Sequence, residues 1–342
     1  MTCKVTIQPS GHAFNMAADE TVLEAALREG FVLSYGCRNG ACGSCKGKVL
    51  AGKVDYGTYQ DSALPAAERT AGMALFCQAR PLTDIVIECR EIGAAKDIQI
   101  RTLPCRVQKM ELLAPDVMAV ELKLPQSERL QFLAGQYLEI LLKDGGRRSF
   151  SMANAPHDDA LIQLHMRNYG GTFSQHVFGK MKPKDILRFE GPFGTFFLRE
   201  DSDKPILLVA SGTGFAPIKA IAEHAFHAGV KRPIHLYWGG RRRADLYLNE
   251  LPGRWAGEHP GFRYTPVLSE PAAEDGWTGR TGLVHEAVIA DHPDLSGWQV
   301  YACGNPLMVE AARRDFAARC GLPADEFYAD AFTPAAPAGT PA

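Results

Sequence analysis

Four cysteines in the first part of the chain have a spacing that suits an iron–sulfur cluster. Cys37, Cys42 and Cys45 follow the pattern C-x4-C-x2-C, and Cys77 comes after 31 further residues. Three thiolates from one short segment can wrap a [2Fe–2S] cluster when a distant fourth thiolate completes the ligand set. A zinc site is one alternative, although structural zinc spacings favour short C-x-x-C-type pairs on both sides. Inert buried thiols are the other alternative. We expect the cluster, with these four cysteines as its ligands.

A second group of residues offers the contacts that a flavin needs. Arg148, Phe150 and Ser151 supply a guanidinium for a phosphate, an aromatic face for a ring and a hydroxyl for a ring nitrogen. Further along, Gly170-Gly171 precedes a short helix predicted to begin near Thr172, and such a helix N-terminus suits a pyrophosphate. The first tetrad alone could occur at a sheet edge by accident. The turn Gly191-Pro192-Phe193-Gly194 then closes the predicted barrel, and the order of the three signals along the chain favours a flavin site.

A third group has the form of a nucleotide-binding turn. Gly212, Thr213 and Gly214 follow an apolar strand predicted at Pro205–Ala210, and Pro217 stands in the first turn of the next helix. Backbone N–H groups at such a turn would face a diphosphate. The third glycine of the dinucleotide fingerprint is missing, so the context of strand, turn and helix carries the prediction.

Three more segments complete the predicted nucleotide site. Arg241 and Arg242 are expected near the adenosine end of the cofactor, although at least one arginine of the run from 241 to 243 is expected to lie in a solvated turn. Cys303 and Gly304 end a strand of a predicted parallel sheet, at the carboxyl edge where such sheets bind ligands. Cys303 is expected to contact the nicotinamide, with plain packing as the alternative. Phe332 is expected to cover a ring, with core packing as the alternative.

The elements that must position these groups fall into three predicted domains. Residues 1–92 form an α+β pattern of the β-grasp kind, and residues 101–200 show the many short strands of an antiparallel β-barrel. Residues 201–333 alternate strands with helices, which indicates an α/β domain with a parallel sheet. Residues 93–100 are expected to be a linker, and residues 334–342, all Pro, Ala, Gly or Thr, a disordered tail.

Strands are predicted at Cys3–Gln8, His12–Met16, Cys45–Leu50, Ile85–Arg90, Ala119–Leu124, Tyr137–Leu142, Leu161–Met166, Ile186–Glu190, Pro205–Ala210, Ile234–Gly239, Phe262–Leu268, Gln299–Cys303 and Phe327–Ala331. Helices are predicted at Thr21–Gly30, Ala216–Ala228, Ala244–Leu251, Leu283–Ala290 and Leu307–Cys320. Thr21 and Glu24 have the spacing of a capping box at the start of the first helix.

Composition limits the class of protein. The chain has 342 residues, with 37 Lys and Arg against 39 Asp and Glu, so its formal net charge is −2. A nucleic-acid binder would carry a basic excess, so we expect no nucleic-acid partner. Nine cysteines are an odd number in a chain too long for a disulfide scaffold. The start of the chain leads into a strand pattern, and runs such as Ile206–Ala210 are too short to cross a bilayer. We expect a cytoplasmic monomer with reduced thiols and no membrane partner.

With these residues assembled, the chain resembles the ferredoxin–NAD(P)H reductase superfamily, in the branch with an N-terminal plant-type ferredoxin. The motifs that carry the resemblance are Cys37–Cys45, Phe76-Cys77, Arg148–Ser151, Gly212–Pro217 and Cys303–Pro306. It runs from Cys3 to about Phe332, nearly the whole chain. Members include reductase components of phenol, benzoate and methane oxygenases and sugar reductases, and the sugar reductases are the more similar.

The resemblance implies the domain order ferredoxin, FAD, NAD. It places Arg148, Phe150 and Ser151 at FAD and implies pyrophosphate contacts from Gly171, Phe173 and Ser174. Two departures stand out. The usual tyrosine of the R-x-Y-S motif is Phe150, so stacking survives without the hydroxyl contact. The common C-G-P-P turn reads Cys-Gly-Asn-Pro at 303–306, a conservative change.

The resemblance also implies an electron-transfer enzyme. NAD(P)H gives a hydride to FAD, and single electrons pass to the [2Fe–2S] cluster and on to a protein, either a dehydratase holding a deoxysugar intermediate or an oxygenase component. Ser151 at the flavin and Cys303 at the nicotinamide are the residues expected to act in catalysis, and no residue is expected to serve as a general base. NADH is favoured, although the arginines at 241–243 could clamp the 2′-phosphate of NADPH. A redox sensor or carrier without turnover is the alternative, and the nucleotide and flavin motifs argue against it.

Overall fold

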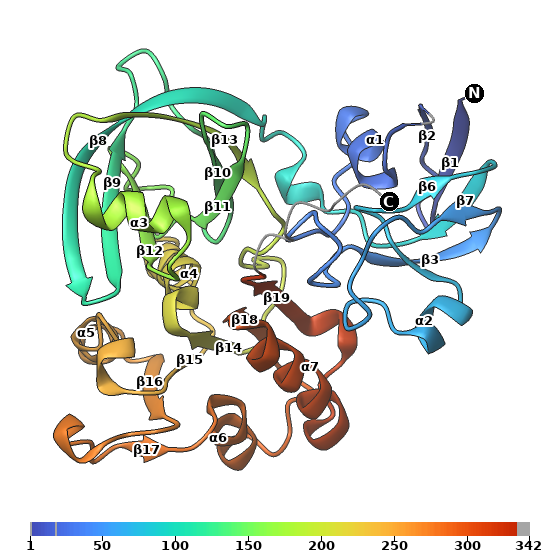
Figure 1. The fold of residues 1–342 in the computed structure, drawn as a ribbon. Helices are drawn as coiled ribbons and strands as arrows, with labels where there is room; N and C mark the ends of the chain where they lie inside the picture. The colour runs from blue at the N-terminus through green and yellow to red at the C-terminus, as the bar shows by residue number, and fades with distance from the viewer. Residues whose placement is uncertain (1, 18, 334–342) are drawn as a thin grey trace. The chain divides into compact units, whose positions relative to one another are not determined.

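Two compact units make up the part of the chain that the computed structural model describes, residues 2–17 and 19–333 (Figure 1). The first unit holds the residues up to Ile98 together with those from Asp330 on, and the second holds Gln99–Ala329. The predicted tail at 334–342 lies outside the described residues. Among the described helices, none combines the length and apolarity that crossing a bilayer requires.

The first unit is built on a five-stranded sheet in the order β2-β1-β7-β3-β5. Its strands are β1 (Cys3–Gln8), β2 (Ala13–Met16), β3 (Lys46–Ala51), β5 (Met73–Leu75) and β7 (Ile85–Glu88), with a separate pair β4 (Val54–Asp55) and β6 (Arg80–Pro81). Its helices are α1 (Val22–Arg28), α2 (Ala66–Thr70) and the 3-10 turn η1 (Gly93–Ala95). The predicted capping box is confirmed, because Glu24 N–H donates to Thr21 Oγ1 at 3.2 Å and Thr21 N–H to Glu24 Oε2 at 2.9 Å. This cap fixes where α1 begins, just ahead of the cysteine loop.

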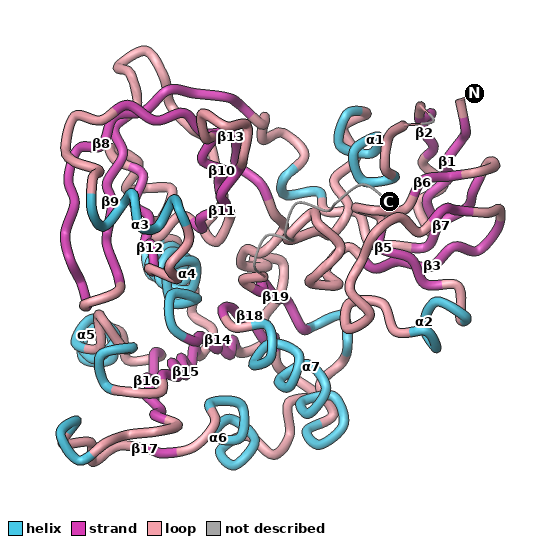
Figure 2. The backbone as a smooth tube through the Cα atoms, viewed as in Figure 1, coloured by secondary structure: helices cyan, strands magenta, loops and turns pink. Residues whose placement is uncertain are grey.

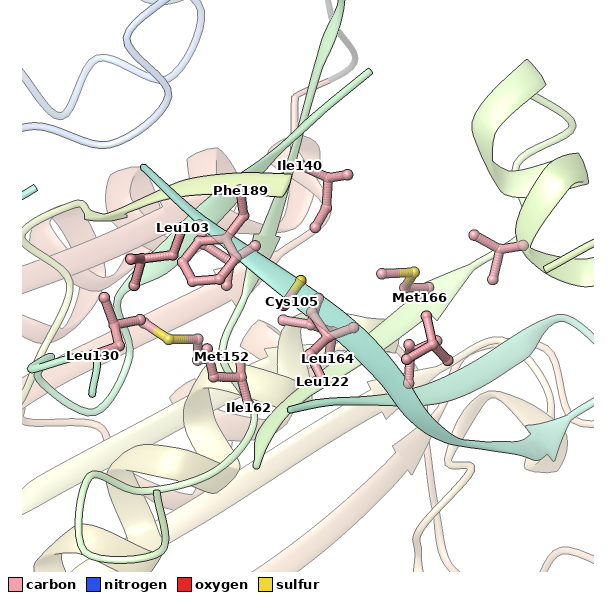
Figure 3. Close-up of a cluster of buried hydrophobic side chains, with 14 of the residues drawn as sticks. Leu103, Cys105, Leu122, Leu130, Ile140, Met152, Ile162, Leu164, Met166 and Phe189 are labelled. Carbon is pink, nitrogen blue, oxygen red and sulfur yellow. The ribbon is translucent and has the colours of Figure 1, made fainter. Parts of the chain in front are cut away.

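The first half of the second unit is an antiparallel sheet in the order β11-β10-β13-β8-β9-β12. The strands are β8 (Arg101–Ala114), β9 (Val117–Lys123), β10 (Tyr137–Leu141), β11 (Arg147–Ser151), β12 (Ile162–Arg167) and β13 (Ile186–Phe193), with helix α3 (Thr172–Gly179) after β12. An isolated antiparallel bridge joins Met152, just after β11, to Leu164 in β12. Inward side chains from these strands, among them Leu103, Leu122 and Phe189, form one buried cluster (Figure 3). The sheet therefore surrounds its own core.

The second half is a sheet in the order β17-β16-β15-β14-β18-β19, and the pairings from β17 to β18 are parallel. Its strands are β14 (Ile206–Ser211), β15 (Ile234–Gly240), β16 (Phe262–Leu268), β17 (Arg280–Thr281), β18 (Gln299–Gly304) and β19 (Phe327–Ala331). The helices between them are α4 (Phe215–His227), α5 (Glu250–Glu258), α6 (Val284–Asp291) and α7 (Pro306–Cys320), labelled in Figure 2. The 3-10 turns are η2 (Gly212–Gly214), η3 (Arg243–Asp245), η4 (Ala273–Asp275) and η5 (Ala324–Glu326). The chain leaves β14 in one direction to β15 and returns on its other side at β18, so the strand order reverses at β14.

The predicted helix at Ala244–Leu251 is wrong. The chain makes only the short turn η3 there, and Leu246 leaves the helical region with a ψ of 57°. Helix α5 begins later, at Glu250, and includes Pro252 in its first turn. A proline is tolerated there because the N–H it lacks would have had no partner inside the helix.

Candidate cofactor sites

The cysteine loop lies between α1 and β3 and has no regular secondary structure. Its backbone takes positive φ angles at Arg38 (62°), Gly40 (74°) and Gly43 (73°). A side chain at Gly40 would place its Cβ 2.7 Å from the backbone oxygen of Thr58, so only glycine fits this turn. The loop is therefore coiled tightly, as three ligands from one short segment require.

The four predicted ligand sulfurs come together in two pairs. The thiols of Cys37 and Cys42 are hydrogen-bonded to each other, and so are those of Cys45 and Cys77. The bond from Cys37 lowers the pKa of the Cys42 thiol despite its burial, and the bond from Cys45 lowers that of Cys77. Two pairs of thiolates are the arrangement that two bridged irons need, with one pair for each iron. The sequence spacing did not reveal which cysteine pairs with which.

Backbone N–H groups of the loop point at these sulfurs. Asn39 and Ala41 donate to Cys37, Ser44 donates to Cys42, and Gly40 donates to Cys77. Donors of this kind stabilise thiolates and, in a bound cluster, raise its potential. The donor set and the paired sulfurs thus fit a [2Fe–2S] cluster. Cys37, Cys42, Cys45 and Cys77 as its ligands stay a prediction.

The flavin motifs, which lie on different elements, meet in space. Phe150 in β11 and Phe173 in α3 face each other, with ring centroids 5.9 Å apart. Ser151 ends β11 and is buried, while Arg148 is half-buried and donates from Nη1 to the carbonyl oxygen of Arg147 at 2.8 Å. The ring of Phe150 and the guanidinium of Arg148 lie two residues apart on β11, which fits a flavin.

The start of α3 is open to an anion. Gly171 is its N-cap, and within the described residues no side chain caps the helix. Ser174 Oγ donates to the carbonyl oxygen of Gly171 at 2.9 Å, and a Cβ at Gly170 would meet no atom within 4 Å. The first N–H groups of the helix therefore remain available to a pyrophosphate, as the sequence predicts.

The two predicted nucleotide turns pack directly on each other. A Cβ at Gly214 would lie 2.2 Å from the carbonyl oxygen of Cys303, and one at Gly304 would lie 2.4 Å from that of Ser211. Asn305 N–H donates to Ser211 Oγ at 2.9 Å, which fixes the end of β18 against the end of β14. Cys303 is fully buried, and Thr213 and Pro217 are buried in η2 and α4. The glycines here allow backbone to touch backbone at the switch point of the sheet.

The three arginines have different surroundings. Arg242 Nε lies 2.7 Å from Asp275 Oδ2 and its Nη2 lies 2.5 Å from Glu274 Oε1. Arg243 donates to the carbonyl oxygen of Asp275 at 3.2 Å, while the side chain of Arg241 is exposed. The charge of Arg242 is thus already paired with two carboxylates.

Phe332 follows β19, is half-buried and groups with the first unit. Its place over a ring of the nucleotide stays a prediction, as do the other predicted flavin and nucleotide contacts.

Sequence reasoning missed four residues that join the two halves of the second unit. Arg167 pairs with Asp245 at 2.5 Å, and His165 Nδ1 lies 2.9 Å from Tyr247 Oη. Burial lowers the pKa of His165 to about 3, so this imidazole is neutral. The one available signal was the alternation in β12, which points the side chains at 165 and 167 to the same face.

Comparison with protein families assigns each part of the chain. Residues 5–82 match the 2Fe-2S iron-sulfur cluster binding domain, residues 104–198 the oxidoreductase FAD-binding domain, and residues 208–314 the oxidoreductase NAD-binding domain. The predicted order of ferredoxin, FAD and NAD domains is confirmed, and so are the [2Fe–2S], FAD and NAD cofactors.

Known proteins match over almost the full chain. The Yersinia pestis protein described as CDP-6-deoxy-L-threo-D-glycero-4-hexulose-3-dehydrase reductase is 39% identical over 98% of this chain and 99% of its own. This agrees with the expected likeness to CDP-6-deoxy-Δ3,4-glucoseen reductase. Protein RfbI of Salmonella typhimurium is 37% identical over 96% of both chains. The crystal structure of the Amycolatopsis cytochrome P450 reductase GcoB superposes with a TM-score of 0.78, at 36% identity over 97% of this chain and 99% of that one. The chain therefore belongs to the family of iron–sulfur flavoprotein reductases, which pass electrons from NAD(P)H through FAD and a [2Fe–2S] cluster to a protein acceptor.

Proposed function

We propose that this reductase takes electrons from NADH and delivers them to a dehydratase that holds a deoxysugar intermediate. The observation that carries the proposal is the degree of likeness to the hexulose-dehydrase reductases of Yersinia, at 39% identity. The oxygenase and demethylase reductases among the relatives share 34–37%. Both groups match over most of their lengths, so the difference lies in sequence and not in domain content.

The residues we propose for each site are those that the sequence predicts. Cys37, Cys42, Cys45 and Cys77 hold the cluster; Arg148, Phe150, Ser151, Gly171, Phe173 and Ser174 hold FAD; Gly212, Thr213, Gly214, Pro217, Arg241, Arg242, Cys303, Gly304 and Phe332 hold the nucleotide. The domains would be 1–92, 101–200 and 201–333, with a linker at 93–100, and the flavin sheet a closed barrel beside a β-grasp ferredoxin domain. We also propose that the protein acts as a cytoplasmic monomer without membrane or nucleic-acid partners, where the ligand thiols stay reduced.

The cofactors supply the redox chemistry: FAD accepts a hydride from the nicotinamide and releases electrons singly, and the cluster carries one electron at a time. The chain binds and orients them. Phe150, whose ring packs near that of Phe173, would offer a flat apolar face to a ring, and the open N-terminus of α3 would offer N–H donors to a pyrophosphate. Ser151, at the end of β11, is the hydroxyl we place at the flavin, and Cys303, at the end of β18, is the thiol we place at the nicotinamide.

The preference for NADH is supported by the state of Arg242. A 2′-phosphate is bound by a free cationic clamp, whereas this guanidinium is already paired with Glu274 and Asp275. Breaking those pairs to bind a phosphate would leave two carboxylates beside the new anion. NADH, which has only a ribose hydroxyl there, meets no such repulsion.

Reconstitution with a defined acceptor tests the proposal. The FAD- and cluster-loaded protein is mixed with NADH and either a CDP-6-deoxy-hexulose 3-dehydrase with its CDP-sugar or a terephthalate 1,2-dioxygenase with terephthalate. We expect NADH oxidation coupled to sugar turnover at a rate well above that with the dioxygenase. Faster coupled turnover with the dioxygenase would overturn the choice of acceptor.

An oxygenase or P450 acceptor is the second candidate. It is favoured by the superposition on the Amycolatopsis P450 reductase, whose chain is covered almost completely. The same experiment separates the two candidates. If NADH fails to bleach the flavin and cluster absorbance at all, the reductase assignment itself is refuted and a non-catalytic sensor takes its place.

A further inference from the structure

One guanidinium joins the flavin half of the second unit to its nucleotide half. Arg167 is the last residue of β12, and only 12% of its side chain is exposed. Its Nε lies 2.8 Å from Asp116 Oδ2, in the turn between β8 and β9, and its Nη2 lies 2.5 Å from Asp245 Oδ1, in η3. The side chain thus holds one carboxylate from each half.

Asp245 also stabilises the turn at 241–245, which we call the arginine turn. Its second oxygen, Oδ2, accepts the N–H groups of Arg241 at 2.8 Å and of Arg242 at 3.0 Å. Although burial raises the pKa of Asp245, the N–H of Arg242 and the charge of Arg167 outweigh it and hold that pKa below its ordinary value. The carboxylate is therefore charged at neutral pH, with one oxygen given to Arg167 and the other to the turn.

The glycine turn lies against the same guanidinium. A Cβ added at Gly212 would be 2.7 Å from Arg167 Nη1, so the side chain rests on the backbone of η2. Arg167 therefore contacts one proposed nucleotide turn directly and reaches the other through Asp245. The planar fork of arginine suits this, because its nitrogens can serve several partners at fixed angles.

We propose that Arg167 is a positioning residue for the nucleotide, setting the distance between the glycine turn at 212–214 and the arginine turn at 241–245. The inference rests on the proposed nucleotide-binding role of these two turns. Removing the guanidinium leaves Asp245 partly buried without its cation, so the arginine turn relaxes away from η2. The nucleotide, which has to contact both turns at once, loses affinity by about tenfold, the size of effect expected from such coupling residues.

Calorimetric titration of the FAD- and cluster-loaded protein with NAD+ tests this without relying on turnover. The variants are Arg167→Gln, Asp245→Asn, the double variant, and Arg167→Lys. Arg319→Gln is the matched control. Arg319 in α7 pairs with Glu286 in α6, away from both turns. Flavin content and the unfolding temperature of each variant show whether it is folded.

We expect Arg167→Gln and Asp245→Asn each to raise Kd about tenfold, and the double variant to raise it no further, because both cut the same link. Arg167→Lys should recover part of the affinity, since one ammonium can serve only one of the two acids. An unchanged Kd in Arg167→Gln, additive effects in the double variant, or an equal rise in Arg319→Gln would each refute the positioning role. If Arg167→Gln does not fold, Arg167→Lys and Asp245→Asn decide by the same criteria. A wild-type protein that fails to bind NAD+ refutes the nucleotide role of the turns, and this inference with it.

Discussion

Replacing Gly214 by alanine puts one methyl group into the tightest contact of the proposed nucleotide site. The new Cβ would lie 2.2 Å from the oxygen and 2.5 Å from the carbon of the Cys303 carbonyl, and 2.7 Å from the Cα of Gly304. All three atoms belong to backbone, so no side chain can turn away to make room. Gly214 has a φ of −58°, which alanine adopts without strain. The substitution therefore tests the close approach alone.

The expected size of the effect follows from that geometry. The strand ends must separate by about 1 Å before the methyl group fits, and overpacking of this kind costs about 1–3 kcal/mol. For a unit of this size, each kcal/mol lowers the melting temperature by about 2–4 °C. The same shift moves the N–H groups at the start of α4 away from the end of β18. A misplacement of about 1 Å at a reacting site can cost up to a hundredfold in rate.

Thermal unfolding of the FAD-loaded protein and stopped-flow reduction by NADH measure the two effects. Gly253→Ala is the matched control, because Gly253 lies in α5 and a Cβ there would meet no atom within 4 Å. Because Gly253 is exposed, alanine there should stabilise the helix by about 0.5–1 kcal/mol and leave reduction unchanged. If Gly214→Ala melted at or above the wild-type temperature and was reduced at the wild-type rate, the packing of the two turns described above would be wrong.

Three further predictions concern the cluster, pH and nucleotide choice. Cys45→Ser should lose its cluster iron and cluster absorbance, while NADH still bleaches the flavin. Cys89→Ser, outside the loop, is the control and should keep its iron. A wild-type iron content in Cys45→Ser would exclude Cys45 as a ligand. Burial lowers the pKa of His165 from 6.5 to about 3, so the folded protein resists a proton that the unfolded chain binds. Stability present above pH 6.5 should therefore fall by about 1.4 kcal/mol per pH unit on acidification, and urea unfolding should show a flatter profile for His165→Gln. Asp275→Asn should remove one of the two carboxylates paired with Arg242 and raise kcat/KM for NADPH relative to NADH. An unchanged ratio would contradict the argument from its ion pairs.

The parts of the molecule that the sequence could predict are those encoded in one short segment. The cysteine loop is such a segment, because its ligand spacing and its glycines lie within ten residues of each other. The capping box at Thr21 and Glu24 is another, since a helix start depends on neighbours three residues apart. By contrast, the helix predicted at Ala244–Leu251 misses the break between η3 and α5, which is set by the backbone angles of Leu246.

The parts that could not be predicted depend on residues far apart in the chain. Arg167 and Asp245 are 78 positions apart, and nothing in either segment indicates the other. The close approach of Gly214 to Cys303 is of the same kind, because it exists only once β14 and β18 are paired. The sequence suggests that Gly212 and Gly214 both belong to a turn, but it does not show that each is needed there for a different reason. Gly212 has a positive φ of 52°, whereas Gly214 is needed for the space beside it.

The proposed sites therefore depend on different properties of the chain, so substitutions should impair each site in a different way. The cluster site depends on the chemistry of side chains, so a single sulfur exchanged for oxygen removes the metal while the fold remains. The nucleotide site depends on the absence of side-chain atoms at Gly214 and Gly304, where any Cβ meets backbone. Substitutions there should displace the turns even though every polar group is still present. The junction at Arg167 lies between these cases, because its guanidinium pairs with Asp116 and Asp245, neither of which is a proposed flavin residue. Through Asp245, its charge holds the arginine turn in place. A substitution at Arg167 should lower nucleotide affinity while the flavin content stays full, and this result distinguishes it from substitutions at the cluster cysteines or at Gly214 and Gly304.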